Sequence, residues 1–179
     1  MNPVKNSRVR RDKLLAAAEG YLALDMPQHA LESLDGIEDP QRAPFKISLL
    51  RGLAFRHLEQ HAAALKALLP AYEEDPNDLS LLLTMAWCYK RTNQLSLAIS
   101  TLEHAYQTHA EEPIVLYNLS CYWTLAGNKV QALSWLGRAL RMDQNLRKLI
   151  PHESDFDTLR HDPDFEMLIG LSGDISTST

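Results

Sequence analysis

The chain of 179 residues has few cysteines, few glycines and no long hydrophobic run, and each shortage excludes a class of protein. No stretch approaches the roughly 18–20 consecutive apolar residues that a membrane-spanning helix needs. The opening residues Met1 to Lys5 are not followed by an apolar segment, so they do not resemble a secretory signal. These absences predict a cytoplasmic protein that does not bind a membrane.

The sequence also lacks the short motifs that mark most catalytic sites, and its two cysteines do not suggest one. Cys88 and Cys121 are the two cysteines, and in a cytoplasmic protein they predict free thiols rather than a disulfide framework. The sequence contains no Gly-rich phosphate loop and no Gly-x-Ser-x-Gly turn, and no histidine is paired with an acid at a motif spacing. We therefore expect no catalytic activity, no cofactor and no metal ion.

Acidic residues outnumber basic ones by 23 to 18, so the formal net charge is −5. Residues 1–10 nevertheless form a polar segment with Lys5, Arg8 and Arg10, which we interpret as a flexible basic arm. No aromatic residues are interleaved with these charges for base stacking. A nucleic-acid partner is therefore not expected.

What the sequence does contain is a pattern with a period of 34 residues. Four windows follow one another without insertion, and each carries a small residue, an aromatic residue, an alanine and a leucine at fixed places. A fixed period in this range is the mark of a repeat architecture. The windows are residues 11–44, 45–78, 79–112 and 113–146.

This pattern resembles the tetratricopeptide (TPR) repeat over residues 11–146. The resemblance implies an all-α fold, a right-handed solenoid of four helical hairpins, in which the first helix of each hairpin lines a concave face. Two features depart from the family pattern. Arg51 stands where the other windows have an apolar residue, and the proline near the end of each window survives only at Pro76.

Each window contains two apolar stripes of helical period separated by a turn. Asn93 and Gly127 occupy that turn, where a left-handed residue is required. Alanine at the crossing of the two helices lets their axes approach closely. The predicted hairpins are Asp12–Leu24 with Pro27–Leu34, Phe45–Leu58 with His61–Glu74, Leu79–Arg91 with Leu95–His109, and Ile114–Ala126 with Lys129–Met142.

After Leu146 the period stops, and we expect residues 147–171 to form short helices that cap the array. Asp162 followed by Pro163 predicts a helix start, and the segment resembles the endings of many bacterial TPR proteins. We expect this tail to cover Trp135, with Phe156, Leu159 or Phe165 packing near it. Residues 172–179, rich in serine and threonine, are predicted to be disordered.

The functional surface is predicted on the concave face, because solenoids bind extended partners there. Its middle combines an apolar strip with a basic edge, which suits a peptide that carries apolar anchors and carboxylates. This predicts a non-enzymatic adaptor or scaffold for an extended or helical peptide segment. The predicted groove residues are Lys46, Leu49, Leu53, Arg56, His57, Leu83, Trp87, Lys90, Arg91, Tyr117, Cys121 and Thr124.

Other interpretations stay open. The apolar strip also suits a self-associating scaffold, and hence a homo-oligomer, or a chaperone for a client protein. Lys90 and Arg91 would favour a helix C-terminus whether or not a ligand binds. The tail is rich in potential ligands for an accessory metal site, although their spacing matches no established motif. These tail residues are His152, Glu153, Asp155, Asp157, His161, Asp162 and Asp164.

One TPR specialisation is not implied. Family members that hold the acidic tails of heat-shock chaperones use a clamp of lysine, asparagine and arginine at fixed groove places. Here those first-helix places hold Leu15 and Glu19, or Leu49 and Leu53 one window later.

Overall fold

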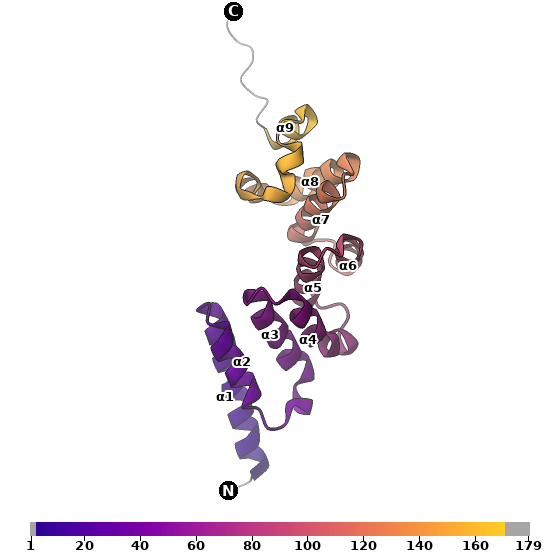
Figure 1. The fold of residues 1–179 in the computed structure, drawn as a ribbon. Coiled ribbons are helices and arrows are strands. Elements are labelled where there is room, and N and C mark those ends of the chain that lie inside the picture. Colours follow the sequence, from indigo (N-terminus) through magenta and orange to yellow (C-terminus); the bar gives the residue numbers. More distant parts are fainter. Residues whose placement is uncertain (1–2, 171–179) are drawn as a thin grey trace, which may run out of the picture. The chain divides into compact units, whose positions relative to one another are not determined.

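The computed structural model describes residues 3–170, and within that range all regular structure is helical (Figure 1). This confirms the all-α fold. The prediction of disorder for residues 172–179 lies outside the described residues. The α-helices are α1 (Pro3–Ala23), α2 (Pro27–Asp35), α3 (Pro44–His57), α4 (His61–Glu74), α5 (Leu79–Arg91), α6 (Leu95–Thr108), α7 (Pro113–Leu125), α8 (Lys129–Met142) and α9 (Pro163–Ile169).

Four short 3₁₀ helices complete the described chain. One lies in the loop between α2 and α3, and three follow α8 in the tail. They are η1 (Pro40–Arg42), η2 (Gln144–Lys148), η3 (Ile150–His152) and η4 (Ser154–Leu159).

The turn between the two helices of each hairpin has the same backbone conformation every 34 residues. The backbone angle φ is positive at Asp25 (55°), Glu59 (57°), Asn93 (59°) and Gly127 (74°). In each case the next residue donates its N–H to a carbonyl five residues earlier, over 2.8–3.0 Å, which is the hydrogen bond of a left-handed helix end. Asn93 and Gly127 adopt the conformation that the sequence predicts, whereas Asp25 and Glu59 adopt it without the usual residue type.

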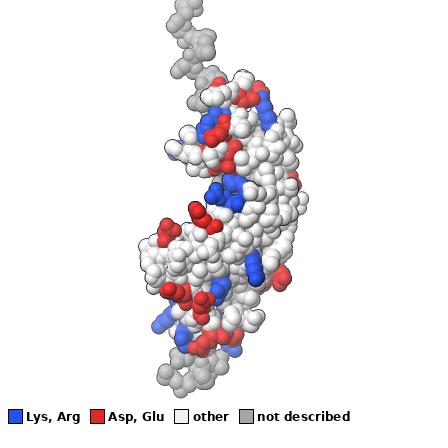
Figure 2. Space-filling model, in the orientation of Figure 1, with Lys and Arg blue, Asp and Glu red and all other residues white. Residues whose placement is uncertain are grey.

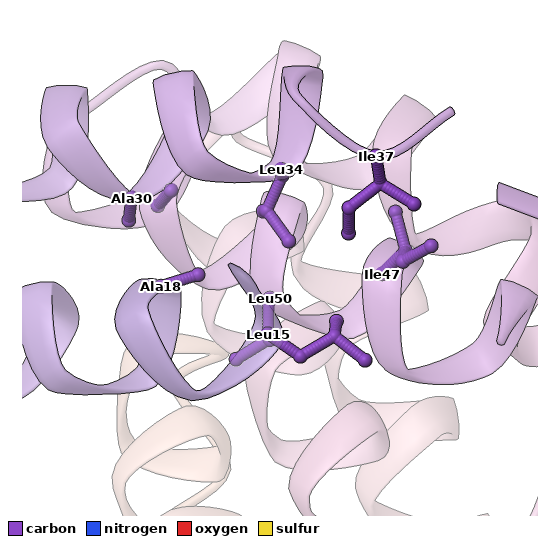
Figure 3. Close-up of a cluster of buried hydrophobic side chains, with 8 residues drawn as sticks. Leu15, Ala18, Ala30, Leu34, Ile37, Ile47 and Leu50 are labelled. Atoms are coloured by element: carbon purple, nitrogen blue, oxygen red, sulfur yellow. The ribbon is translucent and has the colours of Figure 1, made fainter. Parts of the chain in front are cut away.

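Two compact units divide the chain, residues 1–94 and residues 95–179. In the first unit, the helices α1, α2 and α3 enclose one hydrophobic cluster (Figure 3). A second cluster joins α4 to α5 through Leu68, Ala71, Leu81 and Met85. The buried residues of the first cluster are Leu15, Ala18, Ala30, Leu34, Ile37, Ile47, Leu50 and Ala54.

Helices α3 and α4 approach closely at Gly52. A side-chain carbon built at Gly52 would lie 2.2 Å from Leu68 Cδ2 and 2.4 Å from Leu68 Cγ. Leu68 is fully buried and therefore has no free space into which it could move. The absence of a side chain at residue 52 is thus a condition for closing this hairpin.

Replacing this glycine tests the packing directly. Gly52→Ala should lower the free energy of unfolding by roughly 1–3 kcal/mol through overpacking. The matched control is Gly20→Ala in α1, where an added carbon meets nothing within 4 Å. That change should raise stability by about 0.5–1 kcal/mol because alanine favours the helix. Urea denaturation of both variants measures the difference; equal stabilities would contradict the close crossing.

A serine hydroxyl forms hydrogen bonds with backbone groups of α4 near a proline. Pro70 lies inside the helix, where it has no N–H to donate and where its ring displaces the preceding turn. Ala71 donates its N–H to Ser48 Oγ at 3.1 Å, and the Ser48 hydroxyl donates to the Ala67 carbonyl. The hydroxyl from α3 is thus inserted into the hydrogen-bond ladder of α4, which satisfies both backbone groups and ties the two helices together.

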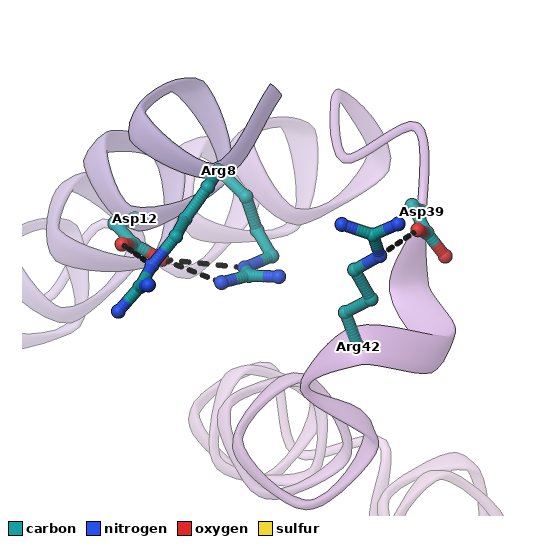
Figure 4. A network of polar contacts seen from close by, with 5 residues as sticks. Arg8, Asp12, Asp39 and Arg42 are labelled. Carbon is teal, nitrogen blue, oxygen red and sulfur yellow. Dashed lines mark hydrogen bonds and ion pairs between the residues drawn. The ribbon is translucent and has the colours of Figure 1, made fainter. Parts of the chain in front are cut away.

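The basic N-terminal segment is helical, which corrects the prediction of a flexible arm. Helix α1 begins at Pro3, and its arginines pair with acids (Figure 4). Asp12 contacts both Arg8 at 3.8 Å and Arg11 at 3.0 Å, while Arg10 reaches Glu38 at 2.5 Å. Such exposed pairs stabilise little, but they offset the positive charge that the sequence concentrates here.

In the second unit, the residues after α8 return to pack onto α7. Phe156 of η4 is fully buried, and its ring meets Tyr117 of α7 edge-on with centroids 5.7 Å apart. The ring centroid of Phe165 of α9 lies 5.4 Å from that of Phe156. Asp162 begins α9 as predicted, since its carboxylate accepts the N–H groups of Asp164 and Phe165.

The ring contacts of Trp135 among the described residues differ from the predicted contacts with tail aromatics. Its ring lies 5.0 Å from Tyr106 of α6, and the guanidinium carbon of Arg138 lies 4.4 Å from the ring centroid. Phe156 contacts Tyr117 of α7 instead. Trp135 is therefore covered by an aromatic residue of the preceding hairpin and by its own helix, and the tail aromatics cover α7.

Candidate functional site

Trp87 is the centre of a group of side chains in the first unit. It is half-buried on α5, and its ring meets His61 of α4 edge-on at 4.9 Å between centroids. The guanidinium carbons of Arg56 from α3 and Arg91 from α5 lie 5.8 and 5.6 Å from the ring. Arg91 follows Trp87 by one helical turn, so the helix itself places the two on one face.

A hollow opens beside this ring. Its volume is about 400 Å³, and it is lined by Arg56, His57, Glu59 and Trp87. We name it the Trp87 hollow. Pockets that hold small ligands or anchoring side chains have volumes of about 300–1,000 Å³, so this hollow has room for one large side chain of a partner.

Arg56 and Arg91 are the cations of this site that remain available. Within the described residues neither of them forms an ion pair, and both are held by the face of Trp87. Other predicted basic residues are engaged, because His57 Nδ1 lies 2.9 Å from Asp25 and Lys46 Nζ lies 2.8 Å from Glu19. The anion-binding capacity is therefore concentrated over one indole ring.

The repeat register shows why the hollow is open. His57 and Asp25 correspond to Arg91 and Glu59 one window later. The first pair is in contact at 2.9 Å, but within the described chain Arg91 and Glu59 form no such ion pair. Arg91 lies against Trp87, an aromatic residue where the earlier window has Leu53. The indole thus holds the cation that would otherwise pair across the turn.

The surroundings of His61 beneath the indole lower its pKa. Desolvation lowers the pKa of His61 below its ordinary value of 6.5, and the positive charge of Arg91 lowers it further. Its Nδ1 is buried and has no hydrogen-bond partner in the described structure. Protonation would add a third positive charge around Trp87.

This depressed pKa predicts a loss of stability in acid. In the unfolded chain His61 takes up a proton near pH 6.5, whereas in the folded protein its pKa is lower. Acid therefore favours the unfolded state: the free energy of unfolding is unaffected by His61 well above pH 6.5 and falls as the pH drops below that value. Lowering the pH from about 7.5 to about 5.5 should therefore lower the melting temperature less in His61→Gln than in the wild type.

The control is His161→Gln, a change at an exposed histidine of the tail. It should leave the acid-induced drop of the melting temperature as in the wild type. A His61→Gln protein that loses as much stability as the wild type would contradict the assignment.

Three predicted groove residues do not belong to an open surface. Tyr117, Cys121 and Thr124 of α7 are only 2, 1 and 4% exposed. Tyr117 is buried because Phe156 of the tail packs on the Tyr117 ring. This part of the predicted groove is corrected: these side chains lie inside the second unit and are not exposed on its surface.

The predicted leucines of the strip are partly buried. Leu53 packs against the hydrophobic cluster of α1 to α3, Leu49 packs against the cluster of α4 and α5, and Leu83 is also half-buried. Lys90 is half-buried and Arg91 is exposed at the end of α5. The open part of the predicted site therefore centres on Trp87 and the arginines.

Sequence analysis missed Glu59, His61 and Trp123. Glu59 lies in the turn after α3 and His61 begins α4. Their places in the 34-residue pattern, close to the predicted groove residues Arg56 and His57, could have indicated that they border the site. Trp123 occupies the aromatic place of its window, which suggests packing alone, yet its indole nitrogen is buried without a partner. A second hollow of about 260 Å³ adjoins it in the second unit, lined by Leu95, Ser96, Ile99, Ser100, Glu103, Trp123 and Ala126.

The charge distribution is mixed. On the face that Figure 2 shows, lysine and arginine side chains lie among aspartate and glutamate side chains, with no broad area of one sign among the described residues. Within residues 3–170, no helix combines the length and the apolar character required to cross a bilayer.

Comparison with known proteins identifies the fold. No protein-family model matches the chain, and no curated protein matches it in sequence. Among solved structures, one of MamA has a TM-score of 0.70 at 17% identity, covering 96% of this chain and 94% of that one. YrrB, described as a TPR protein with an unusual peptide-binding site, has a TM-score of 0.66 at 20% identity, covering 74% of this chain and 68% of that one. These similarities show a TPR-type helical solenoid.

Proposed function

We propose that this protein is a binding module whose Trp87 hollow receives a peptide segment with an apolar anchor flanked by carboxylates. The observation that carries the proposal is the pair of arginines, free of ion pairs within the described chain, that lie over one half-buried indole. Exposed cations usually find acidic neighbours on a surface as mixed as this one. Here both guanidinium groups lie over the indole, and Arg56 also lines the hollow beside it.

Each residue of the site has a distinct role in such a complex. The face and edge of Trp87 offer apolar contact to the anchor, and tryptophan is enriched among residues that dominate binding energy. Arg56 and Arg91 supply planar donors that match carboxylate geometry, and their stacking on the indole fixes their orientation beforehand. Glu59 borders the same hollow and repels acidic groups, so the segment has a preferred direction.

The site also has a rigid base. Its cations lie in the last turns of α3 and α5, where the helix dipole favours positive charge whether or not a ligand is present. The ring of His61 supports the indole from α4. The likeness to YrrB supports peptide binding as the class of function, because a fold of this type carries such a site in that protein.

A peptide library tests the proposal. Fluorescein-labelled peptides with one aromatic or leucine residue flanked by aspartate and glutamate should bind, and versions with lysine flanks should not. Trp87→Ala should weaken binding by about 30-fold, the effect of a typical hot-spot residue. Arg56→Glu combined with Arg91→Glu should weaken it by more than about tenfold and remove its salt dependence.

The matched control is Arg138→Glu, which alters an arginine that also lies on a tryptophan but belongs to the second unit. Its affinity should equal that of the wild type, and circular dichroism should show equal helicity in all variants. Fluorescence anisotropy measures the affinities. Selected peptides that bind equally well to the Trp87 and arginine variants would overturn the proposal.

A further inference from the structure

A thiol and two carboxylates meet in the second unit where the tail packs onto α7. Cys121 Sγ and one carboxylate oxygen each of Glu153 and Asp155 all lie within 4.8 Å of one another. Cys121 belongs to α7, Glu153 precedes η4, and Asp155 lies within η4. Residues more than 30 positions apart in the chain are thus brought together by folding.

Two of these side chains are withdrawn from water. Cys121 is 1% exposed and Asp155 is 9% exposed, while Glu153 is half-buried. Glu153 also accepts the N–H of Asp155 at 3.2 Å, which fixes its carboxylate at the start of η4. The guanidinium of Arg160 contacts the backbone carbonyl of Glu153 and the carboxylate of Asp157.

A second and independent observation points into this cluster. Tyr117 lies one helical turn before Cys121 on α7, so both side chains share a face. It is 2% exposed, and its hydroxyl has no hydrogen-bond partner in the described structure. A buried hydroxyl without a partner is costly and indicates a missing polar group at this place.

We propose that Cys121, Glu153 and Asp155 bind a zinc ion, with the Tyr117 hydroxyl donating a hydrogen bond to a water molecule that completes the coordination. Sulfur favours zinc over magnesium or calcium, which prefer sites made of oxygen alone. Zinc accepts thiolate and carboxylate ligands together in tetrahedral sites. The two carboxylates and the thiolate more than balance the charge of the ion.

Binding releases one proton. The Cys121 thiol must lose its proton to the solvent as the sulfur–zinc bond forms, so affinity should rise with pH. The ion would join α7 to η4 and fasten the tail to the last hairpin. Glu153, the most accessible of the three, gives the route of entry.

The inference revises two expectations from the sequence. Cys121 was assigned to the peptide groove, and no metal site was expected because the acids of the tail have no motif spacing. Glu153 and Asp155 are joined by Cys121, the third ligand of the proposed site, only when the tail folds back onto α7. The site lies in the second unit and is independent of the Trp87 hollow.

Cobalt(II) is a suitable probe, because a cobalt–thiolate bond gives a charge-transfer band in the near ultraviolet. Full-length protein, reduced and freed of metal with a chelator, should develop this band on titration with one equivalent of cobalt(II), and zinc(II) should displace it. Zinc(II) should also raise the melting temperature, since an ion that binds only the folded state stabilises it. Glu153→Gln should weaken cobalt binding by more than about tenfold, and Cys121→Ser should abolish the band.

Two controls separate this site from the rest of the chain. Cys88→Ala removes the other thiol, which is buried in α5 and whose pKa burial raises to about 11. Asp157→Asn removes an exposed acid of the same 3₁₀ helix. Both should leave the band and its midpoint unchanged. Folded wild-type protein without a stoichiometric band, or a band that survives Cys121→Ser, would overturn the proposal whatever the stability of the variants.

Discussion

The close approach of two antiparallel helices is the constraint on which this structure depends. It requires a missing or small side chain where the helices cross, and a left-handed residue where the chain reverses. Gly52 meets the first condition against Leu68, and the positive φ angles at residues 25, 59, 93 and 127 meet the second. Because both requirements are local, they recur with the 34-residue period and build each hairpin in the same way.

The same geometry creates the proposed binding site. The last residues of the first helix in one hairpin lie beside the turn residue of the preceding hairpin. Between the first and second hairpins, His57 and Asp25 occupy these two places and are in contact. At Trp87 an aromatic residue replaces leucine, Arg91 lies against the ring, and a hollow remains next to Glu59. Changes of residue type at three repeated places (Leu53 to Trp87, His57 to Arg91 and Asp25 to Glu59) thus accompany the difference between a structural contact and a candidate binding surface.

Most of the fold could be predicted from the sequence because its signals are local and repeated. Helix boundaries such as His61–Glu74 and Leu79–Arg91 agree with the structure, since caps and apolar periodicity lie within each element. Glu59 was missed as a left-handed residue because the requirement comes from the hairpin and overrides the preference of glutamate. Ser48 was missed because its role depends on Pro70 in another helix.

The site was predicted only in part, for a related reason. Register places Arg56, Trp87 and Arg91 on one face, and the structure brings them together. The burial of Tyr117 and Cys121 depends on the tail. The tail lies outside the repeat, so the 34-residue pattern does not predict how it packs on α7. The partnerless Tyr117 hydroxyl and the neighbouring carboxylates likewise become visible only after folding.

The central claim is that Trp87 marks the binding surface, and the three tryptophans are natural probes of it. Each lies in a different setting: Trp87 under two arginines, Trp123 beside the second hollow and Trp135 against Tyr106. The most direct measurement is an NMR titration that follows the three indole N–H signals while an acidic peptide with an apolar anchor is added. The account predicts that the Trp87 signal shifts progressively to saturation while those of Trp123 and Trp135 stay in place. Saturable shifts of Trp123 or Trp135 with an unmoved Trp87 signal would contradict it.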